Sequence, residues 1–509
     1  SLAQPLVDRW GVAGGRLFTV FIGLLCSAGT AFLAARLAPP GRRNAAAFVA
    51  FALVAVNVYQ SQFFTIVKTY ALTALFLVLG LAALTFAGRR RGWVAAFLSG
   101  VLLSLAAGTR LSAGAVLPVV FLGLAWEAWR QGSEVRGQKS EVGEWGVVGA
   151  VGFAAGAAAT LAIVFLPFWV KAPGGLWFAL VEYHAGREPG GLLATLAYKA
   201  GFISRVVQDY FVAIAILLFT VAVPARSRKL APRPAGSEAC PASRGVGSLP
   251  RAPRGRKSEV GIQESEVGEQ MAEGKGRDAL LWVLGIGVVA VTAVHLSAPF
   301  PYDDYQVMIF PAFAAGVAVG LVRITEMVHE QRAAVTALLL CVACAFSSPV
   351  NQGWFIGQRD RIWWPVKERF PMAALQEAGR HIRSITKPDD LLLTQDAYLA
   401  VESGRRLPPG MELGPFFYFP GWSREKASSR HVLNREMMVE LLRSGGAPVA
   451  AFSGWGLALQ APEIRELPWE EQQALRGLVE ENYELDRTIE AFGHAEPAFA
   501  CRRRRRRGR

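Results

Sequence analysis

The chain has 509 residues, of which 52% are hydrophobic and only 18% are charged, and its formal net charge is +14. Its mean hydropathy is positive, which is rare for a soluble protein of this length, so we interpret the sequence as that of a membrane protein. Its five cysteines are too few and too scattered for a framework of disulfide bonds.

Ten apolar stretches qualify, or nearly qualify, as membrane-spanning helices. A helix needs about 20 apolar residues to cross a hydrocarbon core about 30 Å thick, because it rises about 1.5 Å per residue. In chain order the stretches are residues 17–35, 45–62, 69–88, 92–109, 111–127, 146–170, 208–225, 279–298, 305–322 and 333–350. The sequence therefore predicts a polytopic α-helical membrane bundle of about ten transmembrane helices, within a membrane domain of residues 1–350.

Lysine and arginine are distributed unevenly between alternate loops, and cytoplasmic loops are the ones that retain them. The basic loops contain Arg36, Arg42 and Arg43, residues 88–92, Arg130, Arg136 and Lys139, residues 226–277, and Arg323 and Arg332. The other loops hold Lys68, Arg110 and the segment 171–205, which has four basic residues in 35. We therefore expect the basic loops to be cytoplasmic, and the segment 171–205, residues 299–304 and everything after residue 350 to face outward.

Residues 226–277 form the longest of the basic loops. They are rich in Pro, Gly, Ser, Arg and Glu and contain almost no large apolar residues. Such a segment cannot bury enough apolar surface to offset the entropy of ordering the chain. We predict a disordered cytoplasmic loop.

After residue 350 the long apolar stretches end, and short helical and strand patterns alternate. The segments "PMAALQEAGRHIRSI" and "NREMMVELLRS" have the apolar spacing of helices, whereas "DDLLLTQD" and "APVAAFSG" are typical of short strands. This alternation predicts a small extracytoplasmic α/β domain over residues 351–509. Its end carries "RRRRRR" at 502–507, which we interpret as a solvated basic tail.

Three residues at outward helix ends are candidates for binding a lipid phosphate. Lys68 and Tyr70 stand at the head of one apolar stretch, and Arg110 lies in a short turn between two others. A lysine and a tyrosine in such places can also serve only to anchor a helix in the membrane interface. Side by side, however, Lys68 and Arg110 would make a cationic pocket at the membrane face, which suits a lipid-borne phosphate.

Two outward loops carry acids and further basic groups. The segment "VEYHAGREPGG" supplies Glu182, His184 and Arg187, and "PYDDYQ" supplies Asp303 and Asp304. A carboxylate over a cationic pocket could take the proton from an attacking hydroxyl, and an arginine could stabilise the departing phosphate. Each of these residues taken alone could equally be an ordinary loop charge.

Other polar features of the apolar stretches favour packing over chemistry. His295 lies about two turns before the aspartates, and we interpret it as a helix-packing histidine with a hydrogen-bonding partner. Cys341 and Cys344 spell C-x-x-C without the second pair or the histidines of a zinc site, so no metal site is predicted there.

Walker-type glycine loops, G-x-S-x-G and H-E-x-x-H do not occur in the sequence, which leaves ATP-driven transport, serine hydrolysis and zincin chemistry without support.

Four segments carry a resemblance to a known superfamily: "GGRLFTVFIGLLCSAGTAFLAARLA", "VKTYALTALFLVLGLAAL", "LSGVLLSLAAGTRLSAGAVLP" and "PYDDYQVMIFPAFAAGVAVGL". In this order they resemble the membrane half of the C-type lipid-linked-sugar-dependent glycosyltransferases, which include protein mannosyltransferases and aminoarabinose transferases. The likeness covers roughly residues 9–350, and the small C-terminal domain is similar to the extracytoplasmic caps of bacterial members.

The resemblance implies a polyprenyl-phosphate sugar that enters from the bilayer, and transfer of the sugar with inversion to an acceptor on the outer face. It would place Lys68 and Tyr70 where members carry a basic residue and a tyrosine, and Arg110 where a lysine is common. It would place Asp303 and Asp304 on the late outward loop, where they could position acceptor or sugar hydroxyls or bind a divalent cation.

We therefore expect a glycosyltransferase of the bacterial inner membrane that acts on a periplasmic lipid, polysaccharide or protein. In the superfamily the general-base aspartate lies in the first outward loop, which we expect to begin upstream of Ser1. The expected partners are the lipid-linked sugar, membrane lipid and the acceptor, with no nucleic acid. No cofactor is expected beyond a possible divalent cation.

Two alternatives stay open. An O-antigen polymerase or ligase also has about ten spans and a basic outward loop, and its key residues would be Arg187 and His184, whereas Lys68 and Arg110 would tolerate change. A transporter or a non-catalytic scaffold would show charges within helices and broken helices in related halves, and the sequence has no convincing internal repeat.

Overall fold

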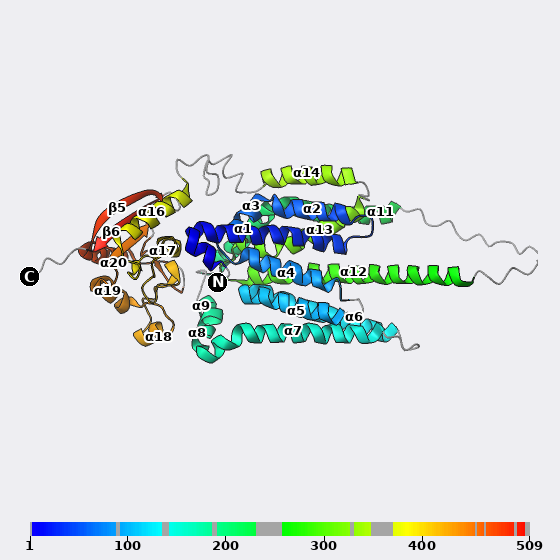
Figure 1. Ribbon diagram of the computed structural model, residues 1–509, viewed down its shortest axis with the longest axis horizontal. Coiled ribbons are helices and arrows are strands. Elements are labelled where there is room, and N and C mark those ends of the chain that lie inside the picture. Colours follow the sequence, from blue (N-terminus) through cyan, green and yellow to red (C-terminus); the bar gives the residue numbers. More distant parts are fainter. Residues whose placement is uncertain are drawn as a thin grey trace, which may run out of the picture.

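The structure is a computed structural model that describes residues 3–87, 92–134, 142–185, 191–230, 257–325, 330–347, 370–453, 456–462, 465–492 and 496–503. Long helices that run roughly parallel form a bundle, and a part that we define as the C-terminal region, residues 370–503, lies at one end of it (Figure 1). The N-terminal end of the chain lies where the two parts meet (Figure 1).

Most helices of the bundle follow the predicted apolar stretches, but residues 173–185 and 192–209, which lie largely in the predicted outward loop 171–205, are also helical. Their bounds are α1 Gln4–Leu37, α2 Arg43–Ala55, α3 Val58–Thr65, α4 Tyr70–Leu84, α5 Gly92–Thr109, the 3-10 helix η1 Leu111–Ala115, α6 Val116–Glu134, α7 Val142–Lys171, α8 Pro173–Trp177, the π-helical turn η2 Phe178–Glu182, α9 Tyr183–Ala185, α10 Leu192–Asp209, α11 Phe211–Leu230, α12 Lys257–Ser297, the 3-10 helix η3 Asp303–Met308, α13 Phe310–Ile324 and α14 Glu330–Ser347. The predicted polytopic helical bundle is therefore confirmed.

The structure does not confirm the predicted number of ten spans. Within the described residues, five helices are long and apolar enough to cross a membrane, or seven if two bent pairs each count as one span. The bends are 67° between α2 and α3 and 84° between α10 and α11. The predicted stretch 45–62 breaks because the Asn57 side chain accepts a hydrogen bond from the Gln60 N–H at 2.9 Å and so starts a new helix. Helices α4 and α13 have only 15 residues each.

The predicted disordered loop 226–277 is partly helical. Helix α11 extends to Leu230 and α12 already begins at Lys257, while residues 231–256 lie outside the described residues. The first part of α12 is rich in Glu, Gln and Lys, which are good helix formers, and a helix that has already nucleated gains one hydrogen bond for each residue it adds. Composition alone therefore underestimated the helix content of this segment.

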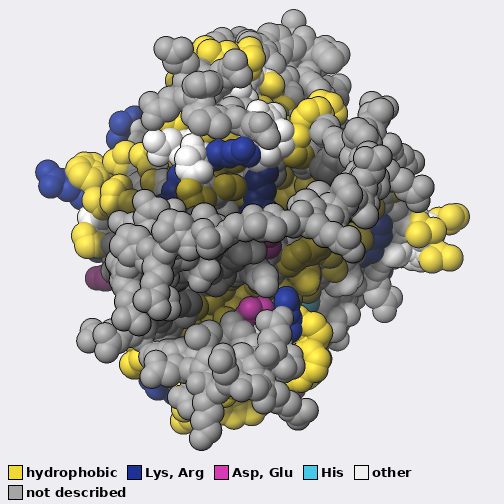
Figure 2. All heavy atoms as spheres, turned by 90° about the vertical axis from the view of Figure 1, so that its right-hand side faces the viewer, with side chains coloured by type: hydrophobic (Ala, Val, Ile, Leu, Met, Phe, Trp, Pro, Cys, Tyr) yellow, Lys and Arg dark blue, Asp and Glu magenta, His cyan; other side chains and the backbone are white. Residues whose placement is uncertain are grey.

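The end of the bundle away from the C-terminal region is basic. There Arg42 donates hydrogen bonds to the carbonyls of Val322 and Arg323 at 3.1 and 3.0 Å, and Arg277 donates to the carbonyl of Ala38 at 3.2 Å. Figure 2 views this end and shows Lys and Arg side chains at several places around it. These arginines come from three of the loops predicted to be cytoplasmic, and the structure brings them together at one end of the bundle.

The C-terminal region combines helices with a mixed sheet. Its elements are α16 Pro371–Ile385, β1 Leu392–Leu393, α17 Ala397–Ser403, the 3-10 helix η5 Gly414–Phe416, α18 Arg424–Ser429, α19 Arg435–Ser444, β2 Val449–Ser453, β3 Leu459–Gln460, β4 Arg465–Glu466, α20 Trp469–Asn482, β5 Tyr483–Phe492 and β6 Glu496–Arg503. The main sheet has the order β1-β2-β6-β5, in which only β1 and β2 are parallel. The two helices and two strands predicted here are confirmed as α16, α19, β1 and β2.

Alternate residues of the sheet enter two separate cores. Leu393 and Ala450 pack in the core that includes α19 and α20, whereas Leu392 and Val449 pack with Ile382 of α16. Side chains of a strand alternate between its two faces. The C-terminal region therefore has helices on both faces of its sheet, as an α/β pattern predicts.

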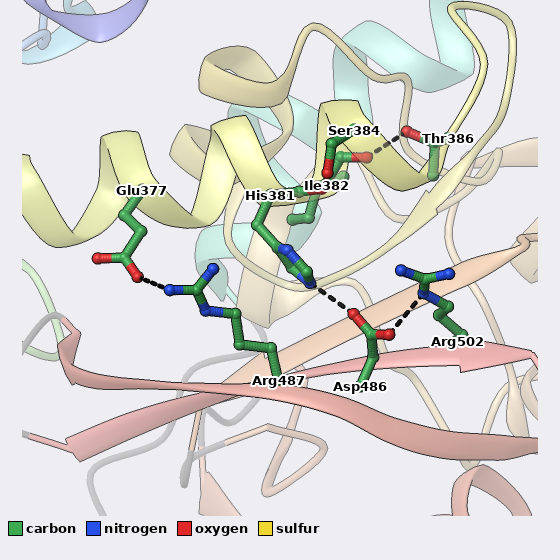
Figure 3. Close-up of polar contacts among 8 residues, drawn as sticks. All are labelled: Glu377, His381, Ile382, Ser384, Thr386, Asp486, Arg487 and Arg502. Atoms are coloured by element: carbon green, nitrogen blue, oxygen red, sulfur yellow. Dashed lines mark hydrogen bonds and ion pairs between the residues drawn. The ribbon is translucent and has the colours of Figure 1, made fainter.

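A bulge in β5 directs two neighbouring residues towards α16. The register of β5 against β6 shifts around Asp486, which is the extra residue of the bulge. The Asp486 carboxylate lies 2.6 Å from His381 Nε2 and 2.6 Å from Arg502 Nε, and Arg487 pairs with Glu377 (Figure 3). These contacts fasten α16 to the β5–β6 hairpin.

We expect Asp486→Asn to lower the free energy of unfolding by on the order of 1–3 kcal/mol, because it weakens the hydrogen bond with His381 and the ion pair with Arg502. Arg502 is about half exposed, so its share is at the low end. Thermal unfolding of the full chain in detergent measures the loss, with the exposed Asp389→Asn as control. Equal melting temperatures for the two variants would contradict this role of Asp486.

Candidate active site

The two aspartates of "PYDDYQ" open the short helix η3, which is anchored through Gln306. The Gln306 amide nitrogen lies 3.1 Å from His295 Nδ1, and its amide oxygen accepts a hydrogen bond from Thr292 at 3.1 Å. The other ring nitrogen, His295 Nε2, lies 2.9 Å from the Ser112 hydroxyl. His295 is thus a packing histidine with both nitrogens partnered, as the sequence indicated, and it helps to hold η3 in place.

Asp304 lies among the three residues predicted to bind a phosphate. The Tyr70 hydroxyl donates a hydrogen bond to Asp304 Oδ2, and Lys68 Nζ lies 3.6 Å from the same oxygen. Arg110 lies over two aromatic rings, with its Cζ 4.0 Å from the centroid of Tyr70 and 5.0 Å from that of Tyr305. Lys68 and Tyr70 thus contact the Asp304 carboxylate directly, and Arg110 joins the same cluster through the Tyr70 and Tyr305 rings.

One oxygen of Asp304 has no hydrogen-bond partner. Oδ1 is buried, and no donor from the described part of the chain reaches it. Leaving a buried acceptor unpaired costs about 1–3 kcal/mol, so such an atom in a cluster of polar groups is a candidate for binding a substrate hydroxyl. The hydrogen bond from Tyr70 fixes the orientation of the carboxylate.

Asp303, by contrast, uses both of its carboxylate oxygens. The Tyr59 hydroxyl of α3 donates to Oδ2, and Arg205 Nε of α10 donates to Oδ1 at 2.7 Å. Helices α3 and α10 each belong to a bent pair, and Asn57 Nδ2 joins the same two bends by donating to the carbonyl of Asp209 at 3.0 Å. Asp303 therefore connects two helix bends, and its contacts suit a structural role.

The sequence did not single out Tyr59 and Arg205. Tyr59 lay within a stretch predicted to be one continuous helix, and Arg205 was one of several cations of an outward loop. The signals that could have found them are polar residues next to each bend, namely Asn57 before α3 and Asp209 at the end of α10.

The loop predicted to supply Glu182, His184 and Arg187 approaches the C-terminal region. Glu182 Oε1 lies 3.5 Å from the guanidinium of Arg430, and the ring centroids of His184 and Tyr183 are 5.4 Å apart. Arg187 lies outside the described residues. Chemical roles for these three residues stay predictions.

No donor set for a metal ion is present in the described residues: no three His, Cys, Asp or Glu side chains come together in a suitable way. Asp303 and Asp304 instead contact cationic and tyrosine side chains. Their geometry does not support the divalent cation that the sequence suggested for them.

Comparison with known proteins shows the fold. No protein-family model matches the sequence, and no curated protein matches it. The chain is similar to ArnT from Cupriavidus metallidurans bound to undecaprenyl phosphate, with a TM-score of 0.50 and 13% identity over 97% of this chain and 85% of ArnT. The apo state of the same ArnT gives a TM-score of 0.47 at 14% identity with the same coverage. The apo Archaeoglobus fulgidus oligosaccharyltransferase gives 0.39 at 12% identity, over 85% of this chain and 59% of that one.

Proposed function

We propose that this chain transfers a sugar from a polyprenyl-phosphate-linked donor to an acceptor on the side of the membrane where its C-terminal region lies. The observation that carries the proposal is that Lys68 and Tyr70 both contact the Asp304 carboxylate, while Arg110 lies over the ring of the same Tyr70. The fold shared with ArnT supports it, because that structure was bound to undecaprenyl phosphate.

Lys68 and Arg110 have the chemistry to hold the donor phosphate. The Lys68 side chain is about half exposed, and its 3.6 Å separation from Asp304 leaves room for a closer anionic partner. The guanidinium of Arg110 is planar and lies over two rings, so it is already oriented to donate several hydrogen bonds to a phosphate. Polyprenyl phosphate would thus enter the site from the bilayer, and Lys68 and Arg110 would neutralise the negative charge of its phosphate there.

Asp304 has the chemistry to activate the acceptor. In the transfer, the acceptor oxygen bonds to the anomeric carbon, the bond from that carbon to the phosphate oxygen breaks, and the hydroxyl proton moves to Asp304 Oδ1. The departing phosphate keeps the electron pair and is stabilised by Lys68 and Arg110. Attack opposite the leaving group inverts the anomeric configuration.

We further propose that the protein resides in a bacterial inner membrane with its C-terminal region in the periplasm. The arginines at the other end of the bundle support this orientation, because cytoplasmic loops retain basic residues. The acceptor would then be a periplasmic glycan, lipid or protein.

Transfer is tested by supplying radiolabelled polyprenyl-phosphate sugars to membranes that contain the protein and following the label into acceptor material. Lys68→Ala should slow transfer by about 10- to 100-fold, because a hydrogen bond to a charged group contributes about 1.5–3 kcal/mol. The exposed Lys171→Ala, at the end of α7, is the matched control. If wild-type membranes move no label from any such donor, the proposed function is wrong. If Lys68→Ala transfers normally, the phosphate site is wrong.

A further inference from the structure

The C-terminal region contacts the bundle beside Lys68 through one short helix, α17. Its N-terminus is capped by the Asp396 side chain, which accepts hydrogen bonds from two backbone N–H groups of the first turn, and it ends at Gly404 in a left-handed conformation with φ 62°. Tyr398 and Glu402 are four residues apart on this helix, so they share a face. That face meets the bundle.

Glu402 binds a break in α1. Gly11, with φ 60° and ψ −143°, interrupts the helix, and the Val12 N–H after the break donates to Glu402 Oε2 at 2.8 Å. Glu402 is only 6% exposed. A carboxylate at the start of a helix satisfies an unpaired N–H and interacts favourably with the helix dipole. A Cβ at position 11 would lie 2.3 Å from the Glu402 oxygen, so only glycine permits this contact.

Tyr398 binds the residue that precedes Lys68. Its hydroxyl donates a hydrogen bond to the carbonyl of Val67 at 3.3 Å. The ordinary pKa of a tyrosine is about 10, so the hydroxyl is protonated at neutral pH and can act as the donor. The other side of Val67 packs on α1, where a Cβ at Gly15 would lie 3.0 Å from Val67 Cγ2. Val67 is therefore held between α1 and α17.

Lys68 depends on this arrangement through its own backbone. Its N–H donates to the carbonyl of Ile66 at 2.8 Å, so residues 66–68 form a tight turn that moves with Val67. We propose that α17 positions Lys68 for the donor phosphate, with Tyr398 and Glu402 as positioning residues contributed by the C-terminal region. The proposal rests on the proposed function for the identity of the ligand, whereas the contact itself can be tested without ligand.

Hydrogen exchange of the ligand-free protein tests the contact. Tyr398→Phe and Glu402→Ala should each speed exchange by about 3- to 10-fold in peptides that cover residues 66–69, since each removes a hydrogen bond that holds this junction. Tyr418→Phe is the control, because the Tyr418 hydroxyl donates to Glu471 at 2.7 Å within the C-terminal region itself. Wild-type exchange at residues 66–69 in both α17 variants overturns the proposal. If Glu402→Ala does not fold, Tyr398→Phe alone decides.

Kinetics test whether the contact serves Lys68. For Tyr398→Phe we expect the KM for the polyprenyl-phosphate donor to rise by about 3- to 10-fold while kcat changes by less than about twofold. A merely structural role would lower the amount of active protein and leave the KM unchanged, and that result also overturns the proposal. If wild-type protein does not bind polyprenyl phosphate at all, the proposed function fails, and the exchange experiment still decides whether α17 holds the turn before Lys68.

Discussion

Sugar transfer should fall by on the order of 10²- to 10⁴-fold when Asp304 is replaced by asparagine, the range expected for the loss of a general base. Asparagine has the same shape and its amide oxygen can still accept a hydrogen bond from Tyr70, but it cannot take a proton. The buried, unpaired Oδ1 is the atom that would receive it. The measurement is the initial rate of transfer with saturating donor, corrected for the amount of folded protein.

Asp303→Asn is the matched control, because it makes the same chemical change one residue away. Both oxygens of Asp303 already accept hydrogen bonds, from Tyr59 and Arg205, so we expect its specific activity to stay within about tenfold of wild type and its melting temperature to fall. A greater loss of specific activity in Asp303→Asn than in Asp304→Asn would show that the two roles are reversed.

Membrane geometry explains why much of the candidate site could be predicted from sequence. The outward ends of helices in one bundle lie at the same depth, so polar residues at those ends share a small area. This shared depth was one reason for selecting Lys68, Tyr70, Arg110 and Asp304, and the structure brings them together. Their chemical roles remain predictions.

Which side chains contact one another within that area could not be predicted, because these contacts depend on where the helices bend and how they are rotated. In the stretch 45–62 the clearest sign of the direction change is Asn57, which caps the new helix, and its meaning was overlooked, so the approach of Tyr59 to Asp303 was missed. Likewise, nothing in the alternation of loops indicates that Asp303 forms an ion pair with Arg205 while Asp304 forms one with Lys68.

In the C-terminal region, too, some elements could be predicted from the sequence and others could not. The helices and strands with regular apolar spacing, such as α16 and β2, were predicted, because periodicity reports burial on one face. The hairpin β5–β6 was missed, since charged residues interrupt the apolar alternation of β5 at its bulge. The contact of α17 with α1 joins residues 390 positions apart, and no local pattern encodes such a contact.

Replacing Arg110 by alanine should lower kcat/KM for the donor by about 30- to 1,000-fold, because removing one member of a buried charge pair costs about 2–4 kcal/mol. Arg110→Lys should lose about 3- to 30-fold, since it keeps the charge but not the planar group that lies over Tyr70 and Tyr305. The two variants thus separate the contribution of the positive charge at position 110 from that of the planar group stacked on the rings. Steady-state kinetics with the polyprenyl-phosphate sugar measure both.

Arg36→Ala is the matched control for Arg110, because Arg36 also lies over an aromatic ring, with its Cζ 4.3 Å from the centroid of Phe86, but in the last turn of α1 and not in the candidate site. It removes an arginine of the same kind without touching the candidate site, so kcat/KM should change by less than about threefold. A comparable loss in Arg36→Ala would mean that Arg110 acts by stabilising the bundle. A loss confined to Arg110 places the leaving phosphate beneath its guanidinium, where the developing negative charge strengthens the interaction as the sugar departs.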